Sequence, residues 1–225
     1  MTNLTFIKKE KTKLDINRQE LLNDRELWGS STKQMIHSYF QQVCKTAKEV
    51  EYFFRLGSSI NDIDLNEETI QLSAGVNKTG VFVRERNPET RELEIKEAFF
   101  EKGCCLVASF GQDGKISFMV SPYESQRHEW SDDYIMLYPP MRPEKVSEKV
   151  LRKSVKKFMF YARFTSAWGT RADSLSFSVI MFYWLLLLDI RNQRKLRRKL
   201  IEVGYDWSKL VGAGVIGYFV ALLTK

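Results

Sequence analysis

The sequence predicts an α+β fold: an N-terminal helix packed on an antiparallel β-meander of about six strands, followed by a basic amphipathic helix and a C-terminal apolar helical hairpin. Three observations lead to this expectation. Residues 33–56 carry a helical stripe of apolar side chains, residues 69–138 break into short β-type runs between turns, and residues 174–188 and 210–223 contain no charge.

These patterns divide the chain into four parts. We expect a polar N-terminal segment at 1–31, a soluble α+β domain at 32–142, a basic amphipathic linker helix at 143–170, and C-terminal membrane helices at 171–225 with a basic connector at 191–209.

Charge is distributed unevenly along the chain. Up to Arg142 there are 19 Lys and Arg against 22 Asp and Glu, a net charge of −3, and from Pro143 onward 16 against 6, a net charge of +10. The overall charge of +7 therefore comes from the part that also holds both apolar stretches. Such cations favour an anionic bilayer surface, and they would attract nucleic acid as well, so charge alone leaves both partners open.

The cysteines and the N-terminus indicate the compartment. Cys44, Cys104 and Cys105 are an odd number without metal-ligand spacing, which favours a reducing environment. The first residues, MTNLTFIKKEKTK, contain no apolar run of the length that a signal peptide needs. We therefore expect the N-terminal domain in the cytoplasm and the protein at the inner or cytoplasmic membrane.

The helix predicted at 33–56 follows capping candidates at 30–32 and ends at Gly57. Its apolar stripe, with spacings of four and three residues in alternation, predicts packing on a sheet and consists of Ile36, Phe40, Val43, Ala47, Val50 and Phe54. Before it, we expect only a short helix at 18–27.

Six strands are predicted, at 69–74, 80–84, 92–99, 104–110, 115–121 and 133–138. The turn sequences NPET and GQDG separate two pairs of them. Connections this short exclude the crossover that parallel pairing needs, so the strands should pair antiparallel.

A basic helix is predicted from Pro143 to about Ala167, with apolar residues along one side and cations around the others. This pattern is typical of a helix at a membrane surface or at a partner, and a helix packed on the sheet with solvated cations fits it equally well. The cations expected to contact anionic lipid or another polyanion are Arg152, Lys153, Lys156, Lys157, Arg191, Arg194, Lys195, Arg197, Arg198 and Lys199.

The first apolar stretch is borderline for a membrane span. Fifteen helical residues extend about 22 Å, whereas the hydrocarbon core is about 30 Å thick. With no polar face, the stretch should be buried on all sides, in lipid or in a protein core. One-pass, two-pass and interfacial topologies all remain open. The residues expected to insert are Leu175, Phe177, Val179, Ile180, Phe182, Trp184, Leu186, Val215, Ile216 and Phe219.

The second apolar stretch has small residues at every fourth position, Ala213, Gly217 and Ala221. This spacing allows transmembrane helices to approach closely, which predicts self-association.

Catalytic motifs are weak, so we expect a non-enzyme without a cofactor. His128 lies among charged residues in ESQRHEWSDD, which indicates a polar loop. Glu94 and Lys96 form one half of a metal-dependent nuclease motif, with Asp62 or Asp64 as further carboxylates. A nuclease is therefore an alternative hypothesis.

In the layout of a charged domain followed by short apolar helices, the chain resembles bacterial membrane effectors of anti-phage systems. That resemblance implies a soluble regulatory module, with a nucleotide, oligonucleotide or protein as regulator, controlling helices that oligomerise in the bilayer and permeabilise it. The domain's net charge of −3 is unfavourable for a polyanion. The alternative is a soluble protein with a buried central helix whose basic C-terminal region binds nucleic acid or an acidic partner.

Overall fold

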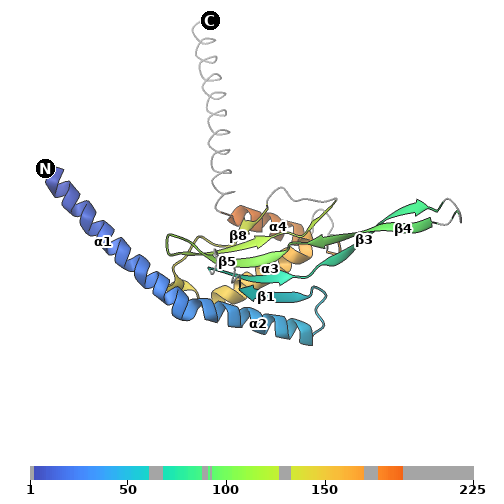
Figure 1. Ribbon diagram of the computed structural model, residues 1–225, viewed down its shortest axis with the longest axis horizontal. Helices are drawn as coiled ribbons and strands as arrows, with labels where there is room; N and C mark the ends of the chain where they lie inside the picture. The colour runs from blue at the N-terminus through green and yellow to red at the C-terminus, as the bar shows by residue number, and fades with distance from the viewer. Residues whose placement is uncertain are drawn as a thin grey trace, which may run out of the picture.

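The computed structural model describes residues 3–60, 68–87, 91, 93–126, 133–169 and 177–189 (Figure 1). It has a long N-terminal helix and antiparallel β-sheets, which confirms the α+β class. One hydrophobic core includes buried residues from Trp28 to Leu185.

The N-terminus forms a helical rod. α1 (Asn3–Leu27) passes through the π-helix η1 (Trp28–Thr32) into α2 (Lys33–Glu49), and α1 projects away from the sheets (Figure 1). The expected short helix at 18–27 is thus part of a much longer one, because no Gly or Pro interrupts the chain before Gly29.

α2 ends earlier than the apolar stripe predicts. Glu51 has a φ of 52°, in the left-handed region, and the Tyr52 amide closes the turn by donating to the Ala47 carbonyl. The chain then enters β1 (Leu56–Ile60), a strand that the sequence analysis missed.

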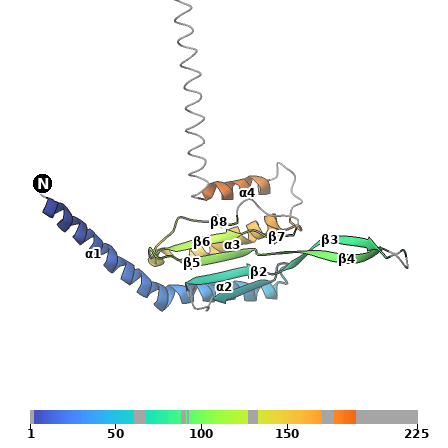
Figure 2. The same ribbon diagram turned by 45° about the horizontal axis from the view of Figure 1, so that its top comes forward.

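The strands form two sheets with antiparallel pairing. The larger has the order β1-β2-β5-β6-β8, where β2 is Thr69–Ala74, β5 is Cys105–Phe110, β6 is Ile116–Ser121 and β8 is Ile135–Met136. The smaller consists of β3 (Asn77–Arg86), β4 (Leu93–Lys102) and β7 (Glu124–Ser125). Because the β3–β4 hairpin lies between β2 and β5 in sequence yet outside their sheet, the arrangement is not the single meander that was expected (Figure 2).

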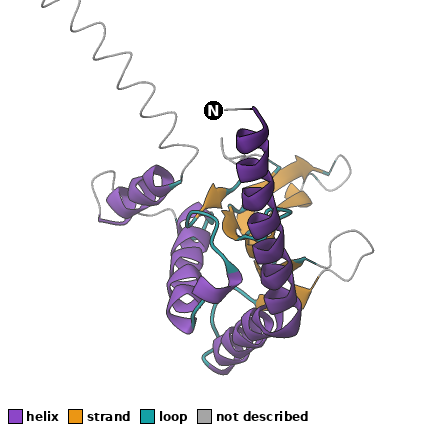
Figure 3. Ribbon diagram, turned by 90° about the vertical axis from the view of Figure 1, so that its left-hand side faces the viewer, coloured by secondary structure: helices purple, strands orange, loops and turns teal. Residues whose placement is uncertain are grey.

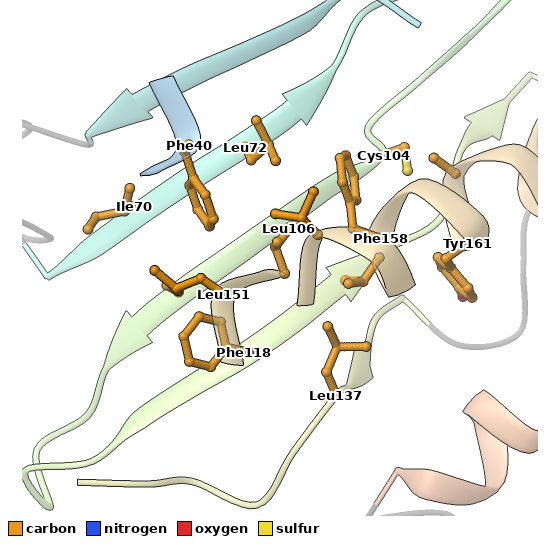
Figure 4. Close-up of a cluster of buried hydrophobic side chains, with 14 of the residues drawn as sticks. Phe40, Ile70, Leu72, Cys104, Leu106, Phe118, Leu137, Leu151, Phe158 and Tyr161 are labelled. Carbon is orange, nitrogen blue, oxygen red and sulfur yellow. The ribbon is translucent and has the colours of Figure 1, made fainter. Parts of the chain in front are cut away.

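The core lies between the larger sheet and the helices. Alternate residues of its central strands are buried, as period-two packing requires. Phe40 of α2 and Leu151 and Phe158 of the last long helix meet these strands (Figure 4). That helix, α3 (Glu148–Thr165), follows the 3-10 turn η2 (Pro143–Lys145).

The rod is attached to the sheet near η1. The Trp28 ring stacks on Phe110, with centroids 5.2 Å apart. The Arg142 Nε donates to both carboxylate oxygens of Asp24, at 3.0 and 3.2 Å. A Cβ at Gly114, which has a φ of 75°, would lie 2.8 Å from the Leu21 side chain, so glycine permits this close approach.

α4 (Phe177–Leu188) is the last described element and lies beside α3 (Figure 3). Among the helices of the described ranges, none combines the length and the apolar character that crossing a bilayer requires.

Candidate membrane-contacting surface

α4 has two apolar faces in different environments. Its inner face includes Phe182 and Leu185, which are 5% and 3% exposed. The opposite side, which we call the outer face of α4, consists of Ile180, Tyr183, Trp184 and Leu187, with exposed fractions of 60%, 61%, 57% and 41%. Spacings of three, four and seven residues from Ile180 place these side chains on one side of the helix.

The inner face is held by aromatic stacking. The Phe182 ring lies 4.1 Å from Phe164 and 5.7 Å from Tyr161, at interplanar angles of 16° and 12°. Just after the helix, a buried Asp189 carboxylate accepts a hydrogen bond from the Met136 amide of β8 at 3.1 Å. These contacts fix which side of α4 faces away from the domain.

α3 presents cations on its exposed side. We call this set the basic face of α3, and its members are Lys149, Arg152, Lys153, Lys156 and Arg163, all exposed. The opposite side of the helix is buried against the sheet.

Lys157 differs from these cations. Its Nζ donates to the Leu137 carbonyl at 3.2 Å and lies 4.1 Å from the centre of the Tyr138 ring. Burial, and to a lesser extent the charge of Lys153, lower the pKa of Lys157. Lys157 therefore belongs to the packing between α3 and the residues that directly follow β8.

The segment after α3 is fastened by a buried carboxylate. Glu101 of β4 is 2% exposed and accepts hydrogen bonds from the Ser166 hydroxyl at 2.5 Å and the Ala167 amide at 2.8 Å. Asn77 donates to the same carboxylate at 3.3 Å. Trp168, which is 55% exposed, follows directly and donates its indole N–H to the Lys78 carbonyl. The start of the connection to α4 is therefore ordered by specific hydrogen bonds.

The predicted site residues fall into three groups. On the described surface, Ile180 and Trp184 lie on the outer face of α4, and Arg152, Lys153 and Lys156 on the basic face of α3. Phe182 is buried, Val179, Leu186 and Lys157 are half-buried, and Phe177 is in α4. Outside the described residues lie Leu175, Arg191, Arg194, Lys195, Arg197, Arg198, Lys199, Ala213, Val215, Ile216, Gly217, Phe219 and Ala221.

The nuclease candidates make other contacts. The Lys96 Nζ pairs with Glu85 across the β3–β4 hairpin at 2.7 Å, and the Glu94 carboxylate accepts a hydrogen bond from the Asn87 side-chain amide at 2.8 Å. Within the described ranges, no group of His, Cys, Asp and Glu side chains is arranged to hold a metal ion. Asp62, Asp64 and His128 lie outside those ranges.

Sequence reasoning missed Tyr183, Leu187 and Glu101. The first two follow Ile180 at helical spacing, so the pattern contained the signal once one side of α4 was known to be buried. Glu101 carried no such signal, because its donors come from residues 24, 65 and 66 positions away.

Comparison with known proteins returned no relative: neither a protein-family model, nor a curated protein, nor a solved structure matches this chain.

Proposed function

We propose that this protein attaches to an anionic bilayer, with the outer face of α4 against the acyl boundary and the basic face of α3 toward acidic headgroups. The single observation that carries the proposal is the stripe of four large, exposed apolar side chains on α4. A helix at the surface of a globular protein normally turns its apolar stripe toward the core. An apolar stripe that is exposed instead is typical of an interaction surface.

The composition of this stripe favours lipid as its partner. Trp and Tyr rings, with an apolar body and a polar edge, are enriched where bilayer and water meet. Each Lys or Arg close to an anionic surface contributes about 1 kcal/mol of attraction. α3 and α4 lie side by side through the Phe164–Phe182 stack, so the elements that carry the apolar and the basic groups are neighbours. In the proposal, one membrane surface contacts both.

Residues 210–223 supply the second part of the proposal. This charge-free segment inserts and associates through Ala213, Gly217 and Ala221, and the α+β domain responds to a regulatory ligand. Assembled helices that are short for the bilayer thin it locally, which accounts for permeabilisation in an effector of this layout.

Vesicle flotation of the full chain tests attachment. We expect it to float with vesicles of phosphatidylglycerol and phosphatidylcholine, and a variant with Ile180→Ser, Trp184→Ser and Leu187→Ser to lose at least about tenfold in partitioning, because three apolar side chains no longer leave water. The matched control is Val81→Ser with Leu93→Ser and Ile95→Ser, which are 44%, 62% and 57% exposed on the β3–β4 hairpin. Equal flotation of the two variants would contradict the assigned surface.

Nucleic acid is the competing partner for the basic face of α3. Competition with an oligonucleotide separates the two: displacement of the protein from vesicles at stoichiometric oligonucleotide would favour the soluble nucleic-acid-binding alternative.

A further inference from the structure

A cavity of about 710 Å³ opens at the C-terminal end of α2, beside the turn that leads into β1. Its lining includes the aromatic rings of Tyr52, Phe53 and Phe54 and the cationic side chains of Lys45, Lys48 and Arg55. Small-molecule sites typically enclose about 300–1,000 Å³. The cavity therefore has the size and the mixed lining of a ligand site.

The charge of the lining favours an anion. Lys45, Lys48 and Arg55 are exposed, and none of them forms an ion pair with another described residue. Glu51 is the acidic residue of the lining. Three cations around one concave surface raise the local concentration of anions, and each is a donor to phosphate oxygens.

The aromatic part offers a stacking surface. Phe53 is 57% exposed although it lines the cavity, and the centre of its ring lies 5.1 Å from that of Phe54 and 5.8 Å from that of Trp168. A planar ring of a ligand on the free side of Phe53 would remove this apolar surface from water. Stacking of a nucleobase on an aromatic side chain is worth about 1–3 kcal/mol.

The backbone around the cavity is fixed before any ligand binds. The Tyr52 amide donates to the Ala47 carbonyl at 2.8 Å, and the Gly75 amide donates to the Arg55 carbonyl at 2.7 Å. Phe54 is buried beneath the turn, 5.5 Å from Tyr123. A site held in this way loses little conformational entropy when it is occupied.

We propose that this cavity binds a nucleoside phosphate, with the base stacked on Phe53 and the phosphate between Lys45, Lys48 and Arg55. The proposal deepens the proposed function, since it assigns a chemical class to the regulatory ligand of the domain. The contact between Phe53 and Trp168 connects the cavity to the segment that leads from α3 toward α4.

Calorimetric titration of the full chain without lipid tests this binding, so its result is independent of membrane attachment. Adenosine monophosphate should bind at least about tenfold more tightly than adenosine or inorganic phosphate, because only the nucleotide engages both parts of the lining. Lys48→Ala with Arg55→Ala should weaken nucleotide binding about tenfold and leave adenosine binding unchanged. Phe53→Ala should weaken both.

Arg84→Ala with Arg86→Ala removes two exposed cations of the β3–β4 hairpin, outside the cavity, and is the matched control, expected to bind the nucleotide like the wild type. The proposal is overturned if no nucleotide binds, if phosphate or adenosine alone binds as tightly as the nucleotide, or if the control weakens binding as much as the cavity variant.

Discussion

At the scale of single residues, Glu101 is the polar group with the clearest structural role. Its carboxylate accepts hydrogen bonds from three donors: the Ser166 hydroxyl, the Ala167 amide and the Asn77 side-chain amide. Glu101→Gln should lower the free energy of unfolding by about 1–3 kcal/mol, because the new amide group sets a donor against these donors. Urea unfolding measures this change.

Glu97→Gln, on the same strand but exposed, is the control for that substitution. Its stability should stay within about 0.5 kcal/mol of the wild type. If both variants unfold alike, Glu101 does not fasten the segment after α3.

We expect Cys104 to lower the free energy of unfolding as the pH becomes alkaline. Burial, followed by the charges of Cys105 and Glu101, raises the pKa of its thiol far above the ordinary 9.0, despite a hydrogen bond with Thr165. The unfolded chain releases this proton above pH 9 and the folded chain retains it, so the stabilisation is complete below pH 9 and is lost as pH rises.

Cys104→Ala should therefore lose about 1 kcal/mol less than the wild type when the free energy of unfolding in urea at pH 10 is compared with that at pH 7.5. Cys44→Ala, at a half-buried thiol, should keep most of the wild-type loss. An identical pH dependence in Cys104→Ala and the wild type would show that the Cys104 thiol does not titrate in this way.

At the scale of elements, the basic face of α3 is expected to set the dependence of membrane attachment on salt. Arg152→Glu with Lys153→Glu and Lys156→Glu should lower partitioning into anionic vesicles at least about tenfold and flatten its salt dependence, because like charges then face the headgroups. The control reverses the charge at three other exposed arginines, on the β3–β4 hairpin, with Arg84→Glu, Arg86→Glu and Arg91→Glu. A control variant that loses as much affinity would mean that overall charge, and not this face, drives attachment. Sedimentation with vesicles at increasing salt measures both.

Elements with regular periodicity were predictable from sequence. The strand at 69–74 was predicted with its observed bounds because its buried and half-buried residues alternate. The end of α2 was not, since Val50 and Phe54 continue the helical spacing although Phe54 lies beyond the helix, buried 5.5 Å from the Tyr123 ring. The separate sheet formed by β3 and β4 could not be predicted either, because sequence order does not specify that β2 pairs with β5.

At the scale of the whole molecule, the site depends on which sides of the helices the core occupies. The charge-free stretch alone predicted burial on every side. In the structure, α4 buries Phe182 and Leu185 against the domain, whereas the side chains of Ile180 and Trp184 are exposed. The cavity beside α2 was not predictable, because it combines residues of a helix and of a turn whose left-handed Glu51 has no signature in the sequence.

The most direct measurement of membrane attachment is quenching of tryptophan fluorescence by anionic vesicles made with brominated acyl chains. The wild-type emission should be quenched, and Trp184→Phe, which keeps an apolar ring at the same position, should lose part of that quenching, because Trp184 lies on the outer face of α4 that is proposed to meet the acyl boundary. Equal quenching in the wild type and in Trp184→Phe would contradict the proposal that the outer face of α4 contacts the bilayer.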